Sequence, residues 1–136
     1  MLKKSIVFVT LAALALGTAA LAQNPPVSPS PIKRTILSKI DLPGTNYETI
    51  TATVEVAPGF KAGRHFHPGV VVGHVTEGEF WIAIDGQPET NMKAGDTKEI
   101  PNRAVHNEGN PGTVPAKLIV TYVVEKGHPM VNPVKD

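Results

Sequence analysis

The segment Gly63-Arg64-His65-Phe66-His67-Pro68-Gly69 places two histidines one residue apart between two glycines. Because side chains alternate between the two faces of a β-strand, His65 and His67 project from the same face of an extended segment. Two imidazoles in that arrangement can bind one transition metal ion without straining the backbone. The segment therefore predicts a strand that carries part of a metal site.

A third ligand has to come from another part of the chain. The candidates are the nearby carboxylates and the three remaining histidines, His74, His106 and His128. His106 is the strongest of these, because it ends the segment 95–106, whose Gly-Asp and Pro-Asn pairs are typical of the turns that begin a hairpin.

Strand patterns flank these segments on both sides. Residues 49–56, 80–84 and 118–124 alternate between apolar and polar or less apolar side chains, and Asp85-Gly86 is a strong hairpin turn signal. Residues 70–75 form a nearly continuous β-branched run, which predicts a strand buried on both faces. From Arg34 onward, no window longer than a few residues keeps the 3.6-residue apolar repeat of a helix. Many short strands between Gly, Pro and Asp turns predict an all-β sandwich or barrel.

Two spaced motifs run through the same part of the chain: Gly59, His65, His67 and Gly78, then Gly95, Pro101, His106 and Asn110. In order and spacing they resemble the two motifs of the cupin family, and the resemblance covers roughly residues 48–125. It implies a small single-domain cupin of the conserved-barrel type. The fold that it implies is an all-β, double-stranded β-helix, also called a jelly-roll barrel.

The resemblance also implies a site. His65, His67 and His106 would line one cavity and bind one divalent transition metal ion, namely Fe, Mn, Ni, Cu or Zn. The glutamate that is usual in the first motif would fall at Val71 or Val72, and neither side chain binds a metal. Three histidines without a carboxylate resemble the iron ligands of some cupin dioxygenases, so the missing glutamate does not by itself remove the site. Arg103 stands where the second motif usually has glycine.

The remaining polar candidates have simpler interpretations. His74 has the opposite parity to His67, so it points away from the pocket unless a bulge at Pro68-Gly69 changes the register and makes it the replacement ligand. His128 lies beside Pro129 and is expected to be solvated. Glu77, Glu79 and Glu99 are candidates for a base near a metal-bound water, but acidic residues at turns are usually just solvated.

The first residues of the chain predict export. Lys3 and Lys4 precede an apolar run at 6–16, and Ala20-Leu21-Ala22 is a small-x-small cleavage site. The apolar run is shorter than the roughly 20 residues that span a bilayer. We expect residues 1–22 to be a signal peptide of the general secretory route, cut after Ala22. The product would be periplasmic or secreted, with no stable membrane anchor.

Composition predicts one domain after this leader. Residues 23–33 are rich in proline and predict a disordered linker, residues 34–126 the barrel, and residues 127–136 an irregular tail. The chain has no cysteine, so its stability has to come from its core and not from disulfides.

Charge and the apolar pattern limit the classes of molecule that the protein is expected to bind. The formal net charge is +1, and loss of Lys3 and Lys4 with the leader makes it slightly negative. There is no basic stripe of the kind that binds nucleic acid, so a small molecule or a metal is the expected partner. Long apolar strands at both ends of the domain predict a homodimer, because they would leave hydrophobic edges open in a monomer.

Two functions follow as competing hypotheses. The first is a periplasmic, metal-dependent oxygenase of the cupin type that acts on a small organic substrate, with catalytic side chains that the sequence does not identify. The alternative is a non-catalytic cupin that binds or senses a small ligand or a metal without turnover. A weaker third hypothesis is a vestigial site in a structural dimer.

Overall fold

The computed structural model describes residues 30–135, which form ten β-strands and contain no helix. The strands are β1 (Ile32–Asp41), β2 (Tyr47–Val56), β3 (His65–Phe66), β4 (Gly69–Glu77), β5 (Glu79–Ile84), β6 (Thr90–Lys93), β7 (Thr97–Ile100), β8 (His106–Gly109), β9 (Ala116–Glu125) and β10 (Asn132–Pro133). No helix able to cross a membrane occurs within this part of the chain. The predicted leader and most of the predicted linker lie outside the described residues.

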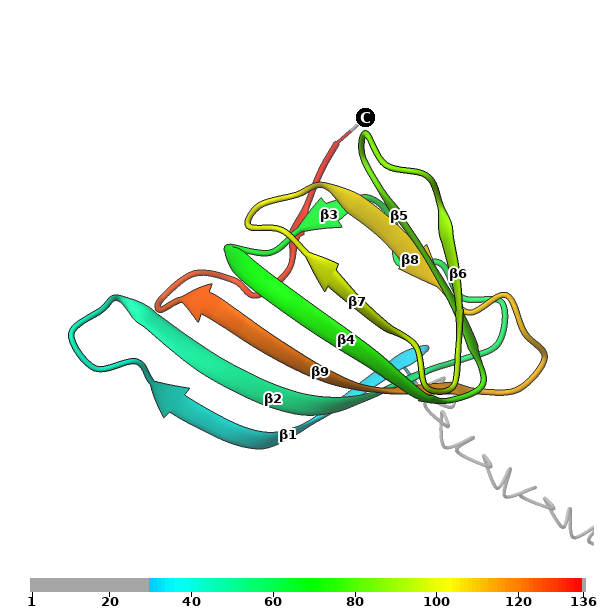
Figure 1. Ribbon diagram of the computed structural model, residues 1–136, viewed down its shortest axis with the longest axis horizontal. Coiled ribbons are helices and arrows are strands. Elements are labelled where there is room, and N and C mark those ends of the chain that lie inside the picture. Colours follow the sequence, from blue (N-terminus) through cyan, green and yellow to red (C-terminus); the bar gives the residue numbers. More distant parts are fainter. Residues whose placement is uncertain (1–29, 136) are drawn as a thin grey trace, which may run out of the picture.

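The strands form two five-stranded antiparallel sheets that face each other (Figure 1). One sheet has the order β1-β2-β9-β4-β7 and the other the order β10-β3-β8-β5-β6. The chain passes back and forth between the sheets, because β4 lies in the first and β3 and β5 in the second. This arrangement is a double-stranded β-helix, so the predicted all-β jelly-roll fold is confirmed.

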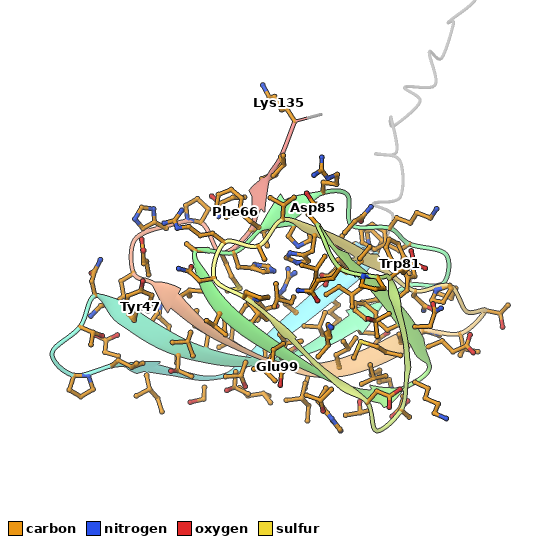
Figure 2. All side chains as sticks on the ribbon, turned by 45° about the horizontal axis from the view of Figure 1, so that its top comes forward. Tyr47, Phe66, Trp81, Asp85, Glu99 and Lys135 are labelled. Carbon is orange, nitrogen blue, oxygen red and sulfur yellow. The ribbon has the colours of Figure 1, made fainter. Side chains whose placement is uncertain are left out.

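Alternation of buried and more exposed residues along β2 and β9 places the core between the two sheets. The inward apolar residues of β2 and β9 are all buried: Ile50, Ala52, Val54, Val56, Ala116, Leu118, Val120, Tyr122 and Val124. Phe80, Ile82 and Ile84 of β5 close the core from the second sheet. Figure 2 shows the side chains that fill this space. Burial of these apolar groups is what stabilises a chain without disulfides.

Strand β4 is buried on one face only, so the prediction of burial on both faces was wrong. Val71 and Val75 are 2% and 0% exposed, whereas Val70 and Val72 are 43% and 36% exposed. The reason is that β4 lies in a two-layer fold, where the outer face of each sheet has no further layer to cover it. β-Branched residues suit a pleated strand on either face, so composition alone did not distinguish the two cases.

Both ends of the domain extend beyond the predicted limits. Strand β1 begins at Ile32, inside the predicted linker. In the tail, Asn132 and Pro133 form β10 and pair with Phe66 and His65 of β3. The predicted irregular tail therefore contains a short strand, and it lies next to the histidine segment. Proline lacks a backbone donor and usually argues against a strand, which is why this edge strand was not expected.

Arg103, at the position of the expected glycine, keeps a conformation that glycine favours. Its φ is 58°, in the left-handed region, which costs a non-glycine residue about 1–2 kcal/mol. Its guanidinium donates a hydrogen bond to Glu125 at 3.3 Å and lies 5.8 Å from the centroid of the Phe66 ring. Its backbone N–H donates to the carbonyl of His67 at 3.3 Å. The bend before β8 is thus preserved and contacts the histidine segment.

Asn110, the last residue of the second motif, ties the end of β8 to two loops. Its side chain is almost fully buried. The amide nitrogen donates to the carbonyls of Val56 at 3.0 Å and Val114 at 2.7 Å, and the amide oxygen accepts from the Gly112 N–H at 2.8 Å. These bonds satisfy buried backbone groups that would otherwise be unpaired, and they hold β8 in register.

Candidate metal centre

Two neighbouring strands bring three histidines to one point between the sheets. His65 of β3 and His106 of β8 are direct cross-strand partners, and His67 follows His65 by two residues. The ring centroids of His65 and His106 are 4.2 Å apart, and each lies 5.0 Å from that of His67. All three residues are buried. One nitrogen from each ring lies within 4.8 Å of the other two, so the three rings form a candidate metal site.

Backbone carbonyl groups set the tautomer of every ring in this cluster. Each Nδ1 lies close to one carbonyl oxygen, in the pairs His65–Gly63 at 2.8 Å, His67–Met130 at 2.6 Å and His106–Ala104 at 2.9 Å. A carbonyl oxygen only accepts hydrogen bonds, so each Nδ1 carries the proton and donates it. Each Nε2 therefore keeps its lone pair free. Metal-binding histidines are oriented in this way in proteins generally.

The arrangement leaves one buried atom unsatisfied. Nε2 of His106 is buried and has no hydrogen-bond partner among residues 30–135. An unpaired buried polar atom costs about 1–3 kcal/mol, so native structures rarely contain one without a reason. A metal ion that accepts the lone pair would satisfy it. The donor set and its geometry therefore fit a transition metal.

Burial keeps two of the rings neutral at physiological pH. Burial lowers the pKa of His67 from 6.5 to about 4, and the hydrogen bond to Met130 opposes this only in part. Burial likewise lowers the pKa of His106 to about 4, against the opposing hydrogen bond to Ala104. Neutral imidazole is the form that binds metals. At pH 7 these two ligands need not lose a proton before they bind an ion.

Acid is expected to destabilise the metal-free protein. Between pH 6.5 and about 4 the unfolded state binds more protons than the folded state at His67 and His106, so the free energy of unfolding falls as the pH falls. Each histidine contributes at most about 1.4 kcal/mol per pH unit in this window. The midpoint of urea unfolding, measured from pH 7 to pH 4, should decrease, and it should decrease less in His106→Gln. Equal pH dependence in the two proteins would contradict the assignment.

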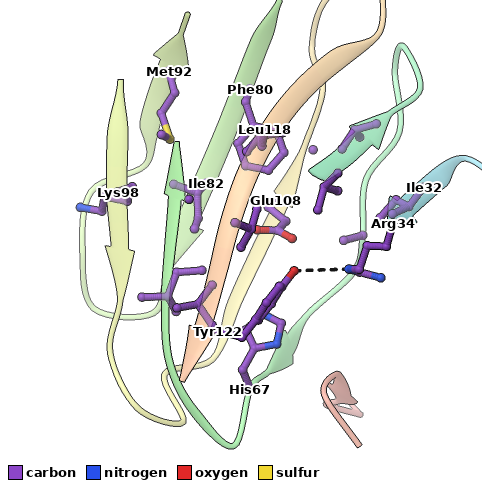
Figure 3. A pocket seen from close by; sticks show the side chains of 18 of the residues that line it. Ile32, Arg34, His67, Phe80, Ile82, Met92, Lys98, Glu108, Leu118 and Tyr122 are labelled. Carbon is purple, nitrogen blue, oxygen red and sulfur yellow. Dashed lines mark hydrogen bonds between the residues drawn. The ribbon is translucent and has the colours of Figure 1, made fainter. Parts of the chain in front are cut away.

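An apolar pocket with a few polar groups adjoins the histidines. Its volume is about 40 Å³, and since a water needs roughly 10–15 Å³ it has room for a few water-sized groups. Its apolar walls include Val54, Phe60, Ile82, Met92 and Leu118, and its polar lining consists of Arg34, His67, Lys98, Glu108 and Tyr122. Figure 3 shows Arg34, Tyr122 and His67 at one end, with Met92 and Lys98 toward the other.

Tyr122 connects the histidines to a cation at the mouth of this pocket. Its ring packs edge-on against His67 with centroids 5.5 Å apart. Its hydroxyl oxygen accepts a hydrogen bond from Nε of Arg34 at 3.3 Å (Figure 3). Burial raises the pKa of Tyr122, and the charge of Arg34 works in the opposite direction. The sequence placed Tyr122 only within the alternating pattern of residues 118–124, and neither Tyr122 nor Arg34 was expected at the site.

Glu108 is the acidic residue at the cluster that sequence reasoning missed. Its carboxylate oxygens lie 3.9 Å from Nε2 of His65 and 4.0 Å from Nε2 of His106. Burial raises the pKa of Glu108, and smaller contributions from His65 and Arg34 oppose that shift. The signal that could have found it is parity, because a residue two positions after His106 on the same strand faces the same side.

The other candidates lie away from the cluster. His74 faces outward, as its parity predicted, and its Nδ1 lies 2.8 Å from the hydroxyl of Thr97. Nε2 of His128 lies 3.4 Å from a carboxylate oxygen of Glu125 near the surface. The three glutamates considered as bases are all exposed: Glu77, Glu79 and Glu99.

Comparison with known proteins finds matches to cupin proteins, both in sequence and in structure. Residues 52–122 match the sequence model described as the cupin domain. A cupin-like protein from Thermotoga maritima is 23% identical over 77% of each chain, with a TM-score of 0.61. A DMSP lyase from Ruegeria pomeroyi is 18% identical over 72% of this chain and 49% of that one, with a TM-score of 0.60. At these identities the two structures show likeness of fold alone.

An oxalate oxidase structure is also similar. It is 26% identical over 79% of this chain and 57% of its own, with a TM-score of 0.60. The present chain therefore spans little more than half of that enzyme. No protein with a curated function matches in sequence.

Proposed function

This chain belongs to the cupin family, and from that premise we propose that His65, His67 and His106 bind one divalent transition metal ion through their Nε2 atoms. One observation carries the proposal. All three Nδ1 atoms donate to backbone carbonyls, so three lone pairs face one another in a buried space. Three neutral nitrogens suit Fe, Mn, Ni, Cu or Zn, and the abundance of each metal decides which is acquired.

We propose further that the protein is a metal-dependent oxygenase for a small organic substrate. Three protein nitrogens leave coordination positions open, and a bound ion would supply Lewis-acid and redox chemistry there. The likeness to an oxalate oxidase supports an oxidation as the reaction. The small pocket supports a substrate of few atoms.

The residues of the chain would contribute binding and orientation. The apolar walls exclude water, which strengthens the electrostatic interactions of any polar group inside. Arg34 and Tyr122 lie at one end of the pocket, where their donors can bind a carboxylate or carbonyl of the substrate (Figure 3). Such contacts would hold a small acid beside the three histidines.

The test is anaerobic reconstitution followed by oxygen uptake. Metal-free protein is loaded separately with Fe(II) and Mn(II), the bound ion is counted, and oxygen consumption is measured with a panel of small organic acids. We expect one ion per chain and oxygen uptake that requires both ion and acid. An ion bound without uptake on any acid would refute the oxygenase and favour the non-catalytic binder. Failure to bind any ion would refute the metal centre itself.

A further inference from the structure

We propose that Glu108 is a fourth protein ligand of this metal ion and supplies the carboxylate that the histidine segment lacks. The inference rests on the proposed three-histidine centre and adds one residue to it. Its basis is position, because the two carboxylate oxygens of Glu108 face Nε2 of His65 and Nε2 of His106, the atoms whose lone pairs are free.

Strand geometry explains why Glu108 reaches this place. It lies two residues after His106 on β8, so both side chains project from the same face of the sheet. His65 is the cross-strand partner of His106, which brings the third side chain to the same face. Glu108 also lines the pocket (Figure 3). The carboxylate thus lies at the boundary between the histidine cluster and the cavity.

The carboxylate of Glu108 lies near the histidine nitrogens without contacting them directly. At 3.9 Å from Nε2 of His65 and 4.0 Å from Nε2 of His106, the carboxylate is too far for hydrogen bonds. Two atoms that bind one tetrahedral ion at about 2.1 Å lie about 3.4 Å apart, so the carboxylate is roughly half an ångström farther from each nitrogen than a bound ligand would be. Glu108 is not among the residues whose ligand atoms all lie within 4.8 Å of one another, so coordination requires a rotation of its side chain that brings one oxygen closer to the three nitrogens.

Charge gives an independent reason. Three neutral imidazoles leave both charges of a divalent ion uncompensated in a buried space, where uncompensated charge is costly. Among residues 30–135, Glu108 is the only carboxylate within 4.0 Å of a histidine of the cluster. Val71 and Val72 occupy the positions where the first motif usually has glutamate, so strand β4 supplies no carboxylate there; Val71 is buried and Val72 faces outward.

No other partner accounts for the carboxylate of Glu108. Its side chain is 19% exposed, and within the described part of the chain it accepts no hydrogen bond. The charge of Arg34, which lines the same pocket, partly opposes the rise in the pKa of Glu108, yet no ion pair between residues 30 and 135 joins Glu108 to an arginine or a lysine. A largely buried carboxylate without a cation in direct contact is unfavourable, and a metal ion would offset that cost.

The inference is tested by metal affinity with Co(II) as the probe. Metal-free wild type, Glu108→Gln and Glu108→Asp are titrated with Co(II) in competition with a chelator, and the visible absorption of bound Co(II) is recorded. Glu99→Gln is the matched control, because it removes the same charge from an exposed position on β7. We expect Kd to rise at least tenfold in Glu108→Gln with a changed spectrum, and to stay within twofold in Glu99→Gln.

The aspartate variant separates coordination from long-range charge. It keeps the charge but shortens the side chain by one methylene, so a ligand should lose affinity and a distant charge should not. A wild-type Kd and spectrum in either Glu108→Gln or Glu108→Asp would overturn the inference. His106→Ala distinguishes this failure from that of the proposed function: if it loses Co(II) while Glu108→Gln keeps it, the three-histidine centre stands and only the fourth ligand is wrong.

Discussion

His106→Ala is expected to lose the metal ion completely. The substitution removes the most deeply buried ring of the cluster, and the two remaining histidines, even together with the carboxylate of Glu108, leave a site with one ligand fewer, whose affinity we expect to fall below the metal concentration used. A ligand present at 100 times its Kd stabilises the folded state by about 2.7 kcal/mol. Metal should therefore raise the Tm of the wild type and leave that of His106→Ala unchanged. Metal content after anaerobic reconstitution gives the second measurement, and His65→Ala and His67→Ala should behave in the same way.

The controls are the two histidines outside the cluster. His74→Ala and His128→Ala should retain one ion per chain and the full metal-induced rise in Tm, because their rings contact Thr97 and Glu125 instead. The comparison within each variant, with and without metal, removes the effect of the cavity that alanine leaves. If His74→Ala also abolished binding, the site would contain a fourth histidine. If none of the five substitutions mattered, the protein would have no histidine metal centre.

The second large effect is expected at Gly69, the last residue of the segment 63–69 that carries His65 and His67. A Cβ atom there would lie 2.0 Å from the carbonyl oxygen of Val123 and 2.7 Å from Cα of Val124. These are backbone atoms of β9 that cannot rotate away, and the φ of 158° is itself unfavourable for alanine. We expect Gly69→Ala to lower the free energy of unfolding by about 3 kcal/mol or more, a large part of a typical total of about 5–15 kcal/mol.

Gly86 provides the matched control for this substitution. Its φ is 79°, but no atom lies within 4 Å of a Cβ added there. Gly86→Ala should therefore lower the free energy of unfolding only by the cost of placing alanine in the left-handed region, about 1–2 kcal/mol. Urea unfolding of both variants measures the difference. Equal losses would mean that β4 and β9 separate at Gly69 without penalty, contrary to the close approach seen here.

The parts of the fold that follow from local alternation were predictable. The inward positions of β2, β5 and β9 appear in the sequence as every second residue, and the structure buries them as expected. The outward direction of His74 follows from the same parity, counted from His67. The order and spacing of glycine, proline and histidine identified the family. Each of these signals lies within a few residues of the feature it predicts.

The parts that depend on distant segments were not predictable. Whether Val70 and Val72 are covered depends on the layers around the sheet, and apolar composition does not reveal that. The pairing of β10 with β3 depends on backbone groups more than 60 residues apart. Glu108 required parity to be continued past His106, together with the knowledge that β8 faces β3. Export, cleavage after Ala22 and dimerisation stay predictions.

The path of the C-terminal segment has a consequence for the order of events during synthesis. The carbonyl that receives the Nδ1 proton of His67 belongs to Met130, and β10 adds to the edge of β3. Until residues 130–133 have left the ribosome, His67 has no such acceptor, and its ring is free to take either tautomer. His65 and His106 obtain their acceptors from residues two positions earlier in the chain. We therefore expect the tail to complete the histidine cluster last, and a nascent or prematurely ended chain to lack the acceptor that orients His67.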